Sequence, residues 1–99
     1  MEKNPDSEAE DHPLRINREV IARRIGDAAV LVHLRTNRIY ELNPTGTRIW
    51  ELLHAGRSRS AITRHLCSEF DVSAEDAGQA VDDLLSLFSR EDLAKTQHD

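Results

Sequence analysis

Apolar and polar residues alternate with a short period in the first half of the chain. Residues 28–34 (AAVLVHL) are rich in Val and Leu, and residues 38–42 (RIYEL) follow after a short connection that contains Asn. Two such runs around a turn are typical of a β-hairpin. A further run, residues 19–25, ends at Gly26-Asp27, which is a turn signal. The pattern therefore predicts three antiparallel strands in a meander over residues 19–42.

The second half of the chain changes to a helical period. Each of three helices has a start signal: Asn43-Pro44, then Ser58 or Ser60, then Ser73 with Asp76 three positions later. Apolar residues recur at helical spacing behind these signals, namely Ile49, Trp50 and Leu53, then Ile62, Leu66 and Phe70, then Ala77, Val81, Leu84, Leu85 and Phe88. The predicted fold class is α+β and winged-helix-like, with an N-terminal three-stranded antiparallel sheet followed by three helices.

The length of 99 residues allows one domain. Residues 1–17 carry many acids and few apolar side chains, which predicts a disordered acidic tail, followed by a folded domain over 18–94 and a flexible end at 95–99. No apolar run reaches the ~20 residues that cross a bilayer. The only cysteine, Cys67, excludes an internal disulfide. We therefore expect a cytoplasmic protein without a membrane segment.

Charge is segregated along the chain although the formal net charge is only −5. Residues 1–14 hold five acids against one lysine, residues 15–65 hold ten arginines against four acids, and residues 66–99 hold nine acids against two bases. Such asymmetry can orient a charged partner. The alternative is that the basic and acidic parts neutralise each other in the fold.

The sequence contains no constellation that favours catalysis. The five histidines are scattered without metal-ligand spacing, and the four glycines are isolated rather than gathered in a phosphate loop. Asp82 and Asp83 are neighbours on a helix and point ~100° apart, which does not suit a carboxylate pair. We therefore predict neither an enzyme nor a bound metal or cofactor.

DNA binding is the alternative function. The first two helices could form a helix-turn-helix that carries several arginines, as in a winged-helix transcription regulator. The third helix, however, carries Glu75, Asp76, Asp82 and Asp83, which a phosphate backbone would repel. No nucleic-acid partner is therefore expected.

A specific stretch resembles the PqqD-like family of peptide-recognition elements. It reads Tyr40-Glu41-Leu42-Asn43-Pro44-Thr45-Gly46, followed by Ile49-Trp50-Glu51-Leu52-Leu53. The family pattern is Tyr-x-Leu-Asn, then x-Thr-Gly, then an Ile-Trp-x-Leu-Leu helix, and weaker similarity extends over residues 18–94. Family members usually end with Gly-Leu-hydrophobic, whereas this chain has Asp92-Leu93-Ala94. A final strand is therefore not predicted.

The resemblance implies a peptide chaperone of ribosomally synthesised, post-translationally modified peptide (RiPP) biosynthesis. Such a RiPP recognition element binds the leader peptide of a precursor and presents it to a modifying enzyme, for example a radical-SAM enzyme, a cyclase or a leader protease. The leader is expected to add as a β-strand beside the third strand, in a groove against the third helix. The residues expected to bind the peptide are Arg38, Ile39, Tyr40, Glu41, Leu42, Gly78, Val81, Asp82, Leu85, Ser86 and Ser89.

Elementary physics agrees with this picture because the third strand ends a meander. Its unpaired N–H and C=O groups invite strand addition. Alternation also places Tyr40 and Leu42 on the packed face, where they serve as core residues, while Ile39 and Glu41 point away. A second copy of the chain could cover the same edge instead. The oligomeric state thus stays open between monomer and homodimer.

Overall fold

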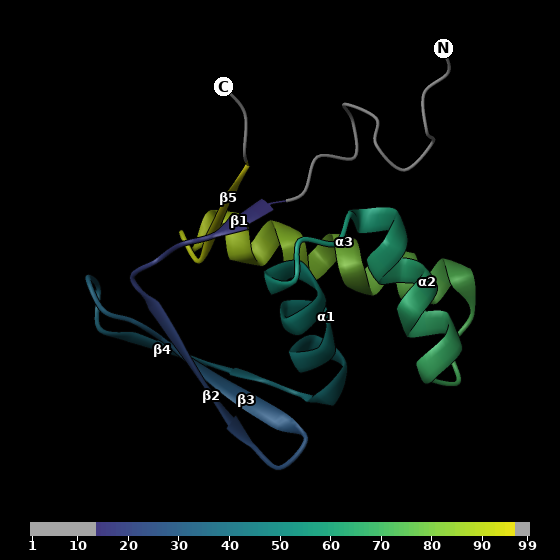
Figure 1. The fold of residues 1–99 in the computed structure, drawn as a ribbon, viewed down its shortest axis with the longest axis horizontal. Helices are drawn as coiled ribbons and strands as arrows, with labels where there is room; N and C mark the ends of the chain where they lie inside the picture. The colour runs from purple at the N-terminus through teal and green to yellow at the C-terminus, as the bar shows by residue number, and fades with distance from the viewer. Residues whose placement is uncertain (1–13, 97–99) are drawn as a thin grey trace.

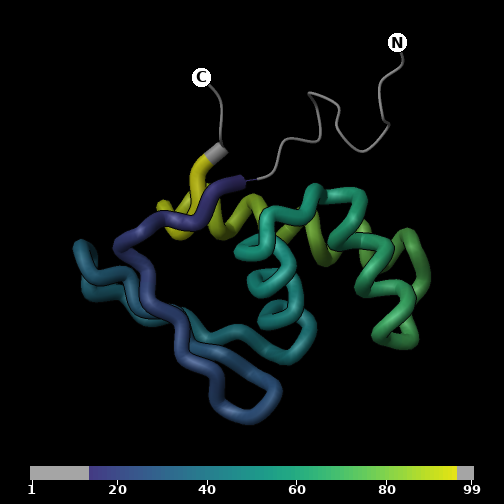
Figure 2. Tube along the Cα trace, viewed as in Figure 1, coloured from purple at the N-terminus to yellow at the C-terminus, as the bar shows by residue number. Residues whose placement is uncertain are grey.

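The computed structural model describes residues 14–96, which form two small sheets and three helices (Figures 1 and 2). The order along the chain is β1 (Leu14–Ile16), β2 (Val20–Ile25), β3 (Ala28–His33), β4 (Arg38–Leu42), α1 (Pro44–His54), α2 (Arg59–Glu69), α3 (Ala74–Arg90) and β5 (Ala94–Thr96). The predicted meander is β2-β3-β4, and three helices follow it. The predicted α+β architecture is therefore confirmed.

The β2-β3-β4 sheet has one packed face and one open face. Antiparallel register sets Leu31 opposite Tyr40 and Ala29 opposite Leu42, so these side chains share the packed face that α1 covers (Figure 1). Leu31 and Leu42 are buried, whereas Ile39, which is opposite Val32 on the other face, is exposed. The alternation read from the sequence thus assigns the two faces correctly.

The helices begin at start signals that the sequence indicates, and of the two alternatives for α2, Ser58 and Ser60, the structure has Ser58 as the cap. The side chains of Asn43, Ser58 and Ser73 accept hydrogen bonds from the N–H groups of Gly46, Ala61 and Asp76, respectively. These caps satisfy backbone donors that a helix leaves free at its first turn. α1 ends before Gly56, which has a φ of 84° in the left-handed region that favours glycine.

The core lies between α1, α3 and the packed face of the sheet. Trp50 of α1 and Phe88 of α3 meet edge to face, with ring centroids 5.1 Å apart. Phe88, Leu31, Ile49 and Val81 are completely or almost completely buried. This packing fixes α3 relative to β4, which is what positions the site described below.

Two short strands, β1 and β5, include residues that the sequence predicts to be tails. β1 pairs with β5 in antiparallel register, Leu14 with Thr96 and Ile16 with Ala94, so both boundaries of the predicted 18–94 domain lie too far inside the chain. Each strand is only three residues long, too short to form without its partner. Because the paired residues Leu14 and Thr96 are 82 positions apart, the local sequence carries no signal of their pairing. The rest of the predicted tails lies outside the described residues. Within residues 14–96 no helix is both long and apolar enough to cross a membrane.

Candidate functional site

β4 is an edge strand of the sheet in the part of the chain that the structure describes, because it pairs with β3 alone. The direction of its amides follows from the connections at the other end of the hairpin. The N–H of Leu34 donates to the carbonyl of Glu19 at 2.8 Å, on the β2 side, while the carbonyl of His33 accepts from the next turn at 2.8 Å. Amide directions alternate along a strand. The register therefore leaves the backbone groups of Ile39 and Glu41 facing the open edge.

A groove of about 410 Å³ runs beside this edge, between the end of β4 and α3. β4 contributes Glu41 and Leu42 to its lining. The remaining lining residues are Asn43, Thr45, Gly46 and Ile49 at the start of α1, and Ala80, Asp83, Leu84, Leu87 and Arg90 on α3. The groove thus has an apolar floor with charged groups along its rim, next to unpaired strand backbone.

Gly46 lets the helices approach each other at the groove floor. A Cβ at this position would lie 3.3 Å from a methyl group of Leu84 and 3.2 Å from the side-chain oxygen of Asn43. The N–H of Gly46 also donates to that oxygen at 2.8 Å. Glycine in the Asn43-Pro44-Thr45-Gly46 stretch therefore sets the spacing between α1 and α3.

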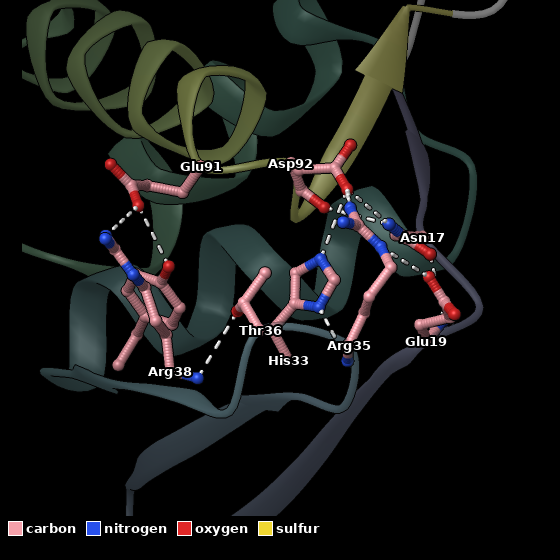
Figure 3. Close-up of polar contacts among 9 residues, drawn as sticks. Asn17, Glu19, His33, Arg35, Thr36, Arg38, Glu91 and Asp92 are labelled. Carbon is pink, nitrogen blue, oxygen red and sulfur yellow. Dashed lines mark hydrogen bonds and ion pairs between the residues drawn. The ribbon is translucent and has the colours of Figure 1, made fainter.

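The start of β4 is tied to the C-terminal end of α3 through Glu91 (Figure 3). The Tyr40 hydroxyl donates to Glu91 Oε1 at 2.9 Å, and Arg38 donates to the same oxygen at 3.2 Å. Burial and the neighbouring carboxylate raise the pKa of the Tyr40 phenol. The sequence predicts all five β4 residues for peptide binding. In the structure, the side chains of two of them, Arg38 and Tyr40, hold β4 against α3.

The predicted residues of α3 lie on a different part of that helix from the groove. Val81 is fully buried in the core, and Asp82 faces α2, where Arg59 donates to it at 2.5 and 2.9 Å. This contact lowers the pKa of Asp82. A Cβ added at Gly78 would lie 3.8 Å from a guanidinium nitrogen of the same Arg59. The structure therefore brings none of these three into the groove.

Leu85, Ser86 and Ser89 also do not line the groove. On α3, the groove is formed by residues at spacings of three and four, Ala80, Leu84 and Leu87, flanked by Asp83 and Arg90. This second apolar stripe is visible in the sequence. The sequence alone favours the neighbouring face through Val81 and Leu85, because nothing in it states which side of α3 faces β4.

Ion pairs join the basic and the acidic parts of the chain. Arg48 donates to Glu69 at 2.7 Å, which raises the pKa of Arg48 and lowers that of Glu69. Arg35 to Asp92, Arg38 to Glu91 and Arg59 to Asp82 are further pairs of this kind. The basic and acidic parts of the chain therefore neutralise each other in the fold through these pairs. The pairs also engage Arg48 and Arg59, two of the arginines on which DNA binding would depend.

Asp92 lies at the centre of a polar cluster that joins the end of α3 to the sheet (Figure 3). Its carboxylate contacts His33 Nε2 at 3.2 Å and accepts from Arg35 at 2.7 Å, while Asn17 donates to its carbonyl at 2.9 Å. The contacts with His33 and Arg35 lower the pKa of Asp92. The cluster contains no third His, Cys, Asp or Glu in metal-ligating reach, and residues 14–96 hold no such group elsewhere.

Comparisons with known proteins agree on one class. Residues 28–94 match the family model described as coenzyme PQQ synthesis protein D (PqqD). The structure of TbiB1 in complex with the TbiA(beta) leader peptide is similar with a TM-score of 0.79 and 29% identity, over 86% of this chain and 99% of that one. Lasso peptide synthetase B1, complexed with the leader peptide, has the same fold, with a TM-score of 0.73 and 24% identity over 85% and 98% of the two chains. No curated protein sequence matches significantly.

Proposed function

Because the chain belongs to the PqqD family, we propose that it binds the leader peptide of a ribosomally made precursor and presents that precursor to a modifying enzyme. The family consists of non-catalytic peptide-binding domains, in line with the prediction that this chain is not an enzyme. TbiB1, which shares 29% identity over nearly its whole length, is bound to a leader peptide. We extend that ligand class to this chain.

The observation that carries the proposal is the open edge of β4 beside an apolar groove. A leader that adds as a strand would pair with the free backbone groups of Ile39 and Glu41, which gives affinity with little demand on sequence. Side chains on one face of that strand would enter the groove over Leu42, Leu84 and Leu87. Burial of apolar side chains there gives selectivity, at roughly 25 cal/mol for each Å² removed from water.

The residues we assign to the peptide site combine the predicted strand with the observed groove. Arg38 to Leu42 supply the pairing edge, and Ala80, Asp83, Leu84, Leu87 and Arg90 supply the opposite wall. Glu41 and Asp83 favour basic side chains in the leader, and Arg90 favours an acidic one. The partner enzyme that receives the precursor is of the radical-SAM, cyclase or leader-protease type, in the cytoplasm.

An NMR titration tests the proposal. The ¹⁵N-labelled chain is mixed with synthetic leaders of the short precursor peptides encoded beside its gene, and with scrambled peptides of equal composition as controls. We expect amide shifts at residues 38–43 and 80–91, and none with the scrambled peptides. Shifts confined to residues 57–67 on addition of duplex DNA, with none from any leader, would contradict the proposal.

A further inference from the structure

The outer face of the β2-β3-β4 sheet is unusually apolar. The large hydrophobic side chains that are exposed within residues 14–96 are Ile21, Ile25, Leu34 and Ile39, with 48%, 63%, 54% and 66% of their surface accessible. Ile21, Ile25 and Ile39 belong to the strands of the meander, and alternation directs these three to the side away from α1. Leu34 follows directly after β3, in the turn to β4. Together the four side chains expose on the order of 400 Å² of apolar surface, which is within the range of the largest apolar patch on an ordinary monomer, a patch that is often functional.

Strand register arranges this outer face in rows. Ile21, Val32 and Ile39 are opposite one another across the three strands and form an apolar row. The next row has Arg23 on β2, Val30 on β3 and Glu41 on β4. The basic Arg23 and the acidic Glu41 therefore lie on opposite sides of the apolar Val30, each on the adjacent strand.

This arrangement is complementary to itself. A two-fold axis parallel to the strands, lying over β3, turns the face onto a copy of itself and exchanges the two edges. Arg23 of one copy then faces Glu41 of the other, twice by symmetry, and the apolar rows face each other. The second copy's Ile25 falls over a hollow of about 510 Å³ that Ala28, Val30 and Glu41 line with others.

We propose that the outer face of the β2-β3-β4 sheet packs on the same face of a second copy of this chain. Two sheets packed in this way lie ~10 Å apart with interdigitated side chains. Because three short strands offer less than the ~800 Å² that each partner gives to a stable interface, we expect weak association that is seen only at high protein concentration. The proposal goes beyond leader binding. The interface shares Glu41 with the leader site, whereas the backbone edge of β4 and the α3 wall of the groove lie beside it.

Sedimentation velocity of the full chain, from about 10 µM to about 1 mM, tests the proposal. The mass is expected to rise from monomer toward dimer over this range, and Ile39→Asp to remain monomeric throughout. Arg23→Glu and Glu41→Arg each place like charges opposite in both symmetric contacts, so each weakens association about tenfold. The double variant Arg23→Glu/Glu41→Arg restores it to within about twofold.

Arg57→Glu, an exposed charge change in the loop before α2, is the matched control and leaves association unchanged. Circular dichroism checks that each variant is folded.

A chain that stays monomeric at every concentration overturns the proposal, as does a double variant that associates no more strongly than the single variants. So does a dimer that a leader peptide dissociates, because that dimer would use the edge of β4. A monomer in which Ile21→Asp abolishes binding of the modifying enzyme assigns the face to that enzyme and also overturns it. Arg23→Glu leaves leader binding intact, so the two proposals can fail separately.

Discussion

Replacing Glu41 by proline probes strand addition directly. The N–H of Glu41 faces the open edge of β4, so proline removes a donor from that edge without removing one from the β3–β4 ladder. The same substitution at Tyr40 would remove a donor that pairs with β3. Two adjacent positions thus have opposite expected outcomes: loss of peptide binding at Glu41 and loss of the fold at Tyr40.

The size of the effect follows from one hydrogen bond and one steric contact. A strand hydrogen bond contributes about 0.5–1.5 kcal/mol net, which corresponds to an affinity change of roughly 2- to 12-fold. The pyrrolidine ring also occupies the space that an added strand needs at van der Waals distance. We therefore expect Glu41→Pro to weaken leader binding about tenfold.

Isothermal titration calorimetry with a cognate leader peptide measures this change. Glu41→Ala is the matched control, because it removes the same carboxylate and keeps the N–H. We expect Glu41→Pro to bind the leader clearly more weakly than Glu41→Ala, with unchanged helical circular dichroism in both variants. Equal affinities for the two variants would refute strand addition on β4, even if the peptide still binds.

Three further predictions concern the groove and the packing around it. Leu87→Ala should weaken leader binding several-fold by calorimetry, whereas Ser86→Ala, on the helix face that the sequence favoured, should not. Asp92→Asn should lower stability at pH 7. Because contacts with His33 and Arg35 lower the pKa of Asp92 in the folded chain, its contribution is present above the ordinary carboxyl pKa of about 4 and is lost as the pH falls through the lowered folded-state pKa. The difference between the two proteins in urea titrations should therefore shrink as the solution is made more acidic. Phe88→Ala should cost about 3–5 kcal/mol in the same assay, because its buried ring also contacts Trp50.

Helix starts could be predicted from the sequence because they depend on local chemistry. Asn43, Ser58 and Ser73 each cap a backbone N–H three residues later, an interaction complete within one turn. The strands of the meander were predictable for a similar reason, since alternation and turn residues lie within one hairpin. The pairing of β1 with β5 depends instead on a contact between the two ends of the domain, for which three-residue segments carry no signal.

The position of the groove on α3 shows the same limit for function. α3 has two apolar stripes, one through Val81 and Phe88 and one through Leu84 and Leu87. Periodicity identifies both but not their neighbours, because the side of α3 that meets β4 is fixed by the packing of Phe88 on Trp50. The open edge of β4 was predictable, since an edge follows from the order of a meander. The α3 wall of the groove required tertiary contacts.

Asp92 explains why the chain forms a last strand without the family's glycine. Its φ is 61°, in the left-handed region that glycine adopts freely and that Asp tolerates better than most residues. A glycine here would remove the strain but would offer no side chain. The Asp92 carboxylate instead contacts the buried His33 and accepts a hydrogen bond from Arg35, both of the β3–β4 hairpin. The N–H of Leu93 still donates to the Phe88 carbonyl at 2.8 Å, which satisfies that carbonyl at the end of α3. The same substitution that departs from the family pattern therefore anchors the hairpin to α3, and with it the relative placement of β4 and the wall of the groove.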